Sequence, residues 1–441
     1  MNKAIILALG GILCSSQLMA QSGASATSPA KTEATPAPPA FSLKISGFVR
    51  NDIMFDSRQI AGSREADLVL YPADKSLVNG KDQNDKASFT MNPITSRLSL
   101  GITGPDAFGA KTSGVLELDF FGATDATTNL ARLRHAYAKL NWTKTELLTG
   151  QFWHPMFVTD CFPATVAYQT VIPVNQFSRN PQVRLTQKVA KNVSIIVAAL
   201  SQNEVNISPG PLGTAGTYGT GDSWSYLANN VIPELHAQAQ YKSSTVIGGA
   251  YIDSKTIRPV VAYDGTVAAT SYGAYLRINT KKVVFKTQYS MVQNAHDLVM
   301  LGGYVQYGTN TATTSATYKA TNTSSFWAEI HGTGKKIVPG IVFAYSGNLG
   351  TNGTTTDGGA TSTASFGRKV VLNGRSIANL TKIMPRVDFI SGKFRIGIEA
   401  DINTAVYGTT GADAKVIEND ASKPTESFTN TRLLVATVYS F

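Results

Sequence analysis

Apolar and polar residues alternate with a period of two along most of the chain after residue 40. The pattern is clearest at the start of this region, where every second residue belongs to one apolar row. That row contains Phe41, Leu43, Ile45, Gly47, Val49, Ile53 and Phe55. Successive side chains of a β-strand point to opposite faces, so the pattern predicts a strand with one apolar and one polar face. Its length of about sixteen residues greatly exceeds the five or six that are usual in soluble sheets.

The final stretch of the chain shows the same alternation and ends on an aromatic residue. Counted back from Phe441, every second position is mostly apolar, whereas Arg432 lies in the other row. A strand with an unpaired edge promotes aggregation in water, and a sheet that closes into a barrel has no such edge. We therefore expect the last strand to pair with the first and close a barrel.

The alternation predicts about sixteen strands, an all-β pattern that is typical of a transmembrane antiparallel β-barrel. The strands start near residues 41, 88, 112 and 131 and then cover 145–153, 182–189, 193–202, 233–242, 245–253, 268–279, 283–291, 325–332, 336–346, 381–390, 394–406 and 430–441. Short turns alternate with long loops, as do the periplasmic turns and extracellular loops of outer-membrane barrels. An even number of strands places both chain ends in the periplasm, and parity places the strand-like residues 298–307 within a long loop.

Strict alternation also fixes the facing of side chains on the strand that starts near residue 131. Arg132 and Arg134 fall in one row, and Leu133, His135 and Tyr137 fall in the other. We therefore expect the two arginines to point into the lumen and the other three side chains to point outward.

Residues 1–20 have the features of a secretory signal peptide. Lys3 supplies the basic start, an apolar run covers residues 4–13, and Ala20 is the small residue before the expected cleavage site. The run is too short for a transmembrane helix. Cys14 offers the alternative of a lipoprotein cysteine, although the large residue before it is untypical.

Residues 21–40 are small, polar and rich in proline, so we expect a flexible periplasmic leader. The barrel then covers residues 41–441. No stretch after residue 20 has the eighteen or so consecutive apolar residues of a helical span. Cys161 is the only cysteine expected in the exported chain, so no intramolecular disulfide is expected.

The chain carries 39 basic and 29 acidic residues, which gives a formal net charge of +10. A basic balance is compatible with nucleic-acid binding, but these charges alternate with apolar residues and do not cluster. Charged side chains cannot face lipid cheaply, so those of a barrel must line water. The pattern therefore favours side chains that line a water-filled lumen. We expect no nucleic acid as a partner.

The charged side chains of the polar faces are the candidate pore-lining residues. They are Arg50, Asp52, Arg97, Glu117, Asp119, Arg132, Arg134, Arg184, Arg277, Arg386, Arg395 and Arg432. Glu117 and Asp119 lie on the strand before Arg132 and Arg134, within cross-strand reach. One interpretation is that such charges pair and stiffen the wall. The other is that an excess of arginines creates a field that favours anionic solutes.

The loop at residues 154–181 is long and unusually apolar. An outward loop of this composition would expose a large apolar patch. The loop therefore either folds into the lumen and narrows the pore, with Asp160 and Arg179 as charged candidates, or packs against a neighbouring subunit.

Several stretches resemble the trimeric outer-membrane porins of the DcaP-like kind. They are ISGFVRNDIMFDSRQ at residues 45–59, RLRHAYAKLNW at 132–142, LLTGQFWHP at 147–155, PRVDFISGKFRIGIEAD at 385–401 and the ending at Phe441. More loosely, the chain is similar to the general sixteen-stranded porins. The resemblance implies a homotrimer in the lipid and lipopolysaccharide of a Gram-negative outer membrane. It also implies an eyelet narrowed by the third loop and diffusion of small anions such as carboxylates.

Enzymatic chemistry finds little support in the sequence. The histidines do not have HExxH spacing, and no G-x-S-x-G motif occurs. The glycine-rich run at residues 216–221 lies in a long loop, so it is not a nucleotide site, and we expect no cofactor, metal or catalytic residue. Two alternatives stay open: an outer-membrane hydrolase, and a barrel that serves as a platform for adhesive loops.

Overall fold

The structure is a computed structural model that describes residues 41–441 except 123–124, 203–222, 312, 352–355, 358–359, 370, 373, 418–421 and 423. The predicted signal peptide at residues 1–20 and the predicted leader at 21–40 lie outside the described residues. No helix among the described residues is long and apolar enough to cross a membrane.

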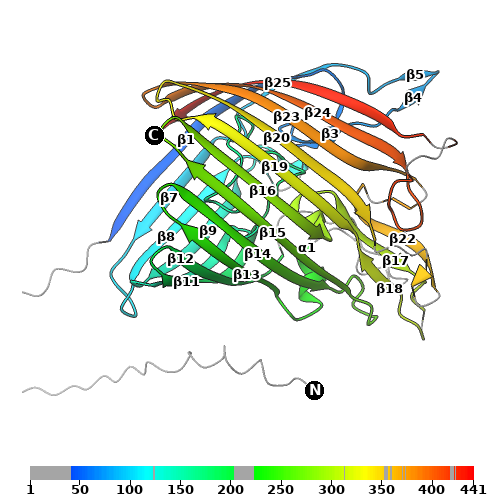
Figure 1. Cartoon of the computed structure of the whole chain (residues 1–441), viewed down its shortest axis with the longest axis horizontal. Coiled ribbons are helices and arrows are strands. Elements are labelled where there is room, and N and C mark those ends of the chain that lie inside the picture. Colours follow the sequence, from blue (N-terminus) through cyan, green and yellow to red (C-terminus); the bar gives the residue numbers. More distant parts are fainter. Residues whose placement is uncertain are drawn as a thin grey trace, which may run out of the picture. The chain divides into compact units, whose positions relative to one another are not determined.

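The described chain is a closed antiparallel barrel of 16 strands (Figure 1). In chain order the wall contains β1 (Ser42–Asp56), β6 (Ser88–Asn92) with β7 (Arg97–Thr103), β8 (Lys111–Asp119), β9 (Arg132–Asn141), β10 (Thr145–Trp153), β11 (Arg179–Ala190), β12 (Val193–Leu200), β13 (Glu234–Lys242), β14 (Val246–Ile257), β15 (Val267–Asn279), β16 (Val283–Gln293), β19 (Asn322–Gly332), β20 (Ile337–Gly350), β23 (Arg375–Ser391), β24 (Phe394–Thr409) and β25 (Glu426–Ser440). The predicted all-β barrel is confirmed.

The last strand closes the barrel by pairing with the first. The register runs from Phe48 opposite Ser440 to Asp56 opposite Arg432. On its other edge, β1 pairs with β6 and β7, which lie end to end and together form one strand of the wall. Pro93 follows β6 directly, and a proline has no N–H to donate to a ladder, which accounts for the break.

The two faces of the wall have the polarity that the sequence pattern predicts. On β1, Leu43 and Ile45 are 55% and 67% exposed, whereas Asp52 and Asp56 are buried inside the barrel. Water on the outer face of such a wall would meet a continuous apolar surface. The outer face therefore suits the hydrocarbon of a membrane.

The connections alternate in length as predicted. The turns β9–β10, β11–β12 and β13–β14 are short, whereas the loops at the other ends of these strands are long. Long loops carry strands of their own. β2 (Ile60–Ser63) pairs with β3 (Leu68–Pro72), and β4 (Leu77–Val78) pairs with β5 (Lys81–Asp82).

Residues 298–307 include a strand, but this strand is not part of the wall. β17 (Gly302–Tyr307) joins β18 (Thr317–Ala320), β22 (Ala360–Arg368) and β21 (Thr356–Asp357) in a separate four-stranded sheet. Figure 1 shows β17, β18 and β22 at the end of the barrel away from the C-terminus. Among the described residues, three short helical segments also lie in loops: η2 (Asp125–Thr127), α1 (Ser223–Ala228) and η3 (Ala295–Leu298). The even number of wall strands had predicted that residues 298–307 belong to a loop, and this prediction is confirmed.

The predicted facing of His135 and Tyr137 is wrong. Glu117 pairs with His135 and Leu118 pairs with Leu133, so Arg134 is an extra residue in β9. Such a β-bulge shifts the alternation by one residue. His135 is therefore 6% exposed on the inner side, where its ring contacts those of Tyr137 and Phe152.

Candidate functional site

The loop at residues 154–181, which we call the inward loop, lies inside the barrel, where most of its residues are buried. Two strands of the wall hold its middle. Arg50 on β1 donates to the carbonyl oxygen of Val166 at 2.8 Å. The backbone N–H groups of Val166 and Ala167 donate to the Glu399 carboxylate on β24, at 2.7 and 3.0 Å.

Strands farther round the barrel hold other parts of the same loop. The Trp327 indole N–H on β19 donates to Asn175 at 3.0 Å. Arg277 on β15 donates to the carbonyl oxygen of Asp160, and Lys242 on β13 approaches the Asp160 carboxylate to 2.7 Å. Inward side chains from both sides of the lumen thus fix the loop, which accounts for its apolar composition: the barrel covers it.

Two further loops pack inside the same end of the barrel. The β2–β3 hairpin is held by Asn403 and Tyr407 of β24, whose side chains donate to backbone carbonyls at residues 70 and 72. The η3 segment meets the inward loop where the N–H of Phe177 donates to the carbonyl oxygen of Leu298 at 2.9 Å. Loop residues therefore fill much of the lumen at this end.

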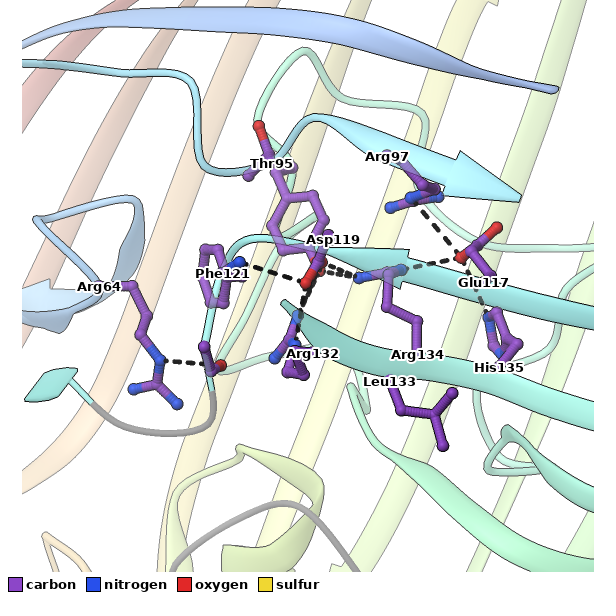
Figure 2. A network of polar contacts seen from close by, with 12 residues as sticks. Arg64, Thr95, Arg97, Glu117, Asp119, Phe121, Arg132, Leu133, Arg134 and His135 are labelled. Atoms are coloured by element: carbon purple, nitrogen blue, oxygen red, sulfur yellow. Dashed lines mark hydrogen bonds and ion pairs between the residues drawn. The ribbon is translucent and has the colours of Figure 1, made fainter. Parts of the chain in front are cut away.

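Arginines and carboxylates form a paired network on β7, β8 and β9 (Figure 2). Arg132 approaches Asp119 to 2.9 Å, and Arg134 approaches both Glu117 and Asp119 to 2.8 Å. Arg97 lies 3.6 Å from Glu117. The carboxylates of one strand face the arginines of the next, so the predicted cross-strand contact is present. We call these five residues the paired network.

The inward loop is attached to the paired network through a tyrosine. The Tyr168 hydroxyl donates to Asp119 at 3.2 Å and accepts from Arg132 at 3.1 Å. It also contacts Arg134, whose guanidinium carbon lies 5.3 Å from the Tyr168 ring centroid. The network therefore pairs its arginines with carboxylates and also positions the loop.

Most other predicted pore residues are also paired along the wall. The distances are 2.6 Å for Arg50–Asp52, 2.7 Å for Arg432–Asp56, 2.5 Å for Arg386–Asp388 and 3.1 Å for Arg395–Asp388. Arg184 and Arg277 donate to neutral oxygens, those of Gln182 and Asn279. Arg179 is 2% exposed and lies 4.8 Å from the Trp153 ring centroid.

A cavity of about 390 Å³ lies between the start of the inward loop and the ends of β9–β13 that carry the short turns. Five basic residues line it, namely Lys139, Lys144, Arg184, Lys188 and Lys242, against two acidic residues, Glu146 and Asp160. Apolar side chains of Leu148, Phe152 and Phe157 complete the lining. We call this space the basic cavity. Its lining has an excess of three positive charges, five minus two, whereas the paired network has an excess of one, three minus two.

Sequence reasoning missed several buried ion pairs. Lys382 on β23 lies 3.0 Å from Asp401, and Lys255 on β14 lies 2.5 Å from Asp297 in η3. The inward facing of Lys382 could have been predicted, because Lys382 lies four residues before Arg386 on β23 and therefore on the same face of the strand. The partner of Lys255 comes from a loop, and no strand periodicity reports on such a contact.

A buried carboxylate in the β2–β3 hairpin titrates near neutrality. Burial raises the pKa of Asp67 to about 7, and repulsion by Asp52 adds to the increase, whereas Arg50 opposes it. Asp67 is 4% exposed, and its Oδ2 has no hydrogen-bonding partner among the described residues. The charge inside the barrel therefore changes around pH 7.

Comparisons with known proteins agree on the fold. No family model matches the chain, and no curated protein matches it in sequence. Among solved structures, the crystal structure of the outer membrane channel DcaP of Acinetobacter baumannii aligns with a TM-score of 0.62 at 18% identity, over 91% of this chain and 97% of that one. An anion-selective porin from Comamonas acidovorans aligns with a TM-score of 0.51 at 10% identity, over 91% and 100% of the two chains. OmpT, an outer membrane protein of Vibrio cholerae, aligns with a TM-score of 0.50 at 8% identity, over 91% and 98%. The chain thus has the porin fold that its sequence resembles.

Proposed function

We propose that this protein is a porin of the Gram-negative outer membrane, through which small hydrophilic solutes diffuse with a preference for anions. The basic cavity is the observation that carries the anion preference. Its excess of basic groups lies in a confined space between low-dielectric walls, which focus the field on a passing solute. The anion selectivity of the Comamonas acidovorans porin, which shares the fold, points the same way.

The resemblance of the sequence to trimeric porins supports a homotrimer as the working assembly. A barrel of this kind presents an apolar belt to lipid, and its loops reach the lipopolysaccharide of the outer leaflet. In this proposal the inward loop sets the width of the pore. The paired network holds the loop in place, and the basic cavity selects the solute.

Planar-bilayer recording tests the proposal. The purified protein should insert and conduct, with conductance steps in groups of three for a trimer. In a tenfold KCl gradient the reversal potential should have the sign of a chloride-selective pore. A cation-selective sign would contradict the anion preference, and an inserted protein without conductance would contradict the pore.

One observation favours a second candidate, a platform for loops that bind a partner. The sheet of β17, β18, β21 and β22 is an ordered structure beyond what a pore requires, and it stands on the loop side of the barrel. A barrel that serves only as a platform would not conduct. The same recording therefore separates the two candidates, and an esterase assay on the same sample tests the hydrolase alternative.

A further inference from the structure

A histidine and two carboxylates meet in the buried interior, away from the paired network. They are His154, the first residue of the inward loop, Glu234 at the start of β13, and Asp253 on β14. One possible ligand atom from each lies within 4.8 Å of the other two. Their exposed fractions are 0%, 0% and 3%. Three separate parts of the chain thus bring one nitrogen and two oxygen donors to one point.

The contact between the two carboxylates requires a positive partner. The Glu234 and Asp253 side chains lie within hydrogen-bond distance of each other. Glu234 Oε1 is 3.1 Å from His154 Nε2, but Oε2 is buried and has no hydrogen-bonding partner among the described residues. Two ionised carboxylates in buried contact repel strongly unless a proton or a cation lies between them.

Groups around the cluster orient its members. His236 Nδ1 lies 3.1 Å from Asp253 Oδ2, and this contact holds the carboxylate in place. Lys255 is nearby, but its ammonium group is 2.5 Å from Asp297 and is already engaged. Carboxylates that bind a metal are commonly held by a further hydrogen bond of this kind.

We propose that His154, Glu234 and Asp253 bind one divalent transition-metal ion of the Zn²⁺ class. One imidazole and two carboxylates are donors that Zn²⁺ accepts, with a fourth position left for water. A proton shared by the two carboxylates would also relieve their repulsion, but it would leave His154 Nε2 in contact with Glu234 alone. The metal joins the root of the inward loop to β13 and β14, and so it restrains the loop where it leaves the wall.

Metal binding at His154 would break one hydrogen bond, that between the Met156 N–H and the imidazole. The Met156 N–H now donates to His154 Nδ1 at 3.2 Å, so the neutral ring carries its proton on Nε2, toward Glu234. With the metal on Nε2, the ring proton moves to Nδ1 and the contact with Met156 is lost. The ion replaces the Nε2 proton between the imidazole and Glu234, and the ring stays neutral.

Zn²⁺ titration of the detergent-solubilised full chain tests the proposal. The protein carries no polyhistidine tag and is first treated with EDTA. Calorimetry should find one high-affinity Zn²⁺ per chain, and loading should raise the unfolding temperature. Glu234→Gln and Asp253→Asn should each weaken binding on the order of a hundredfold, because each removes one charged ligand. Asp106→Asn, in an exposed turn beside Lys111, is the matched control and should bind as the unmodified protein does.

A second measurement does not depend on the folding of any variant. Zn-edge X-ray absorption of the loaded, unmodified protein should show a first shell of nitrogen and oxygen with one imidazole. Equal Zn²⁺ affinity in the Glu234→Gln and Asp253→Asn variants, or a first shell without imidazole, would overturn the proposal. Absence of Zn²⁺ binding, with an infrared band of a protonated carboxyl group that disappears in Asp253→Asn, would also overturn it and assign a shared proton instead.

Discussion

The paired network and the basic cavity are both rich in basic residues, but they differ in how those charges are compensated. Arg134 is 1% exposed and has two carboxylates at 2.8 Å. In the basic cavity, Lys188 and Lys144 are exposed, and neither forms an ion pair with a described residue. Most of the positive charge of the paired network is therefore compensated locally, whereas that of Lys144 and Lys188 is not.

The difference between these regions follows from local geometry. Carboxylates on β8 face arginines on β9 along one ladder, so each charge finds a partner across about 5 Å of sheet. In the basic cavity, Lys139 and Lys242 pair with Glu146 and Asp160. Lys144 lies in a turn and Lys188 at a strand end, and neither meets an acidic strand among the described residues. We infer that the paired network holds the inward loop and that the basic cavity creates the electrostatic field that favours anions. Four predictions test this division, from the largest expected effect to the smallest.

Replacement of Arg132 and Arg134 by alanine should destabilise the protein strongly with little change in selectivity. It removes both arginines from Asp119 and leaves Glu117 with Arg97 alone, at 3.6 Å. Breaking a buried pair in this way costs about 3–5 kcal/mol. Guanidinium unfolding in detergent, followed by tryptophan fluorescence, measures the loss.

A single change, Arg395→Ala, is the control for that double variant. The Arg395 side chain is 32% exposed and lies 3.1 Å from Asp388, so its loss should cost less than about 1 kcal/mol. A large shift of the double variant toward cation selectivity would show that Arg132 and Arg134 act directly on the solute, and the division would then be wrong.

Replacement of Lys144, Lys188 and Lys242 by glutamine should reduce the anion-to-cation permeability ratio on the order of tenfold, because it removes the charge excess of the basic cavity. The barrel wall should still fold, since all three side chains are exposed, and the variant breaks one ion pair, that of Lys242 with Asp160. The reversal potential in a KCl gradient provides the readout.

The matched control replaces three exposed lysines outside the basic cavity, Lys81, Lys281 and Lys335, by glutamine. The net charge changes equally in the two triple variants. If both shift the reversal potential to the same extent, overall charge determines selectivity and the basic cavity has no special role.

Anion preference should be stronger at pH 6 than at pH 8, by about twofold. The pKa of Asp67, raised to about 7 by burial, means that this carboxyl group is mostly neutral at pH 6 and mostly ionised at pH 8. The folded chain then holds a proton that the unfolded chain has lost, so the contribution of Asp67 to stability falls as pH rises from about 4 to 7. Asp67→Asn should remove both effects; a pH dependence that persists in this variant would assign it to another group.

The smallest effect concerns the thiol of Cys161 in the inward loop. Burial raises its pKa to about 11, and its Sγ–H donates to the carbonyl oxygen of Leu276 at 3.4 Å. A maleimide at pH 7.4 should therefore label Cys161 very slowly in the folded protein. Thr159→Cys in a Cys161→Ser background should be labelled rapidly, because Thr159 is exposed and lines the basic cavity. Equal rates would show that the loop is not seated against the wall.

The sequence determined the wall of this barrel, because polarity with a period of two is a local property that each strand carries by itself. It predicted the 16 strands, the alternation of turns and loops, and the inward facing of Arg132 and Arg134. It failed at His135, because one extra residue in β9 changes the facing of every later side chain on that strand.

Only the tertiary structure decided which charges are neutralised. Arg134 and Arg184 have the same pattern in the sequence, yet one meets two carboxylates and the other meets neutral oxygens. The inward loop, the basic cavity and the contact of His154 with Glu234 likewise join residues that are far apart in the chain. Such contacts depend on strand register and on the path of loops through the lumen, and neither is encoded in local periodicity.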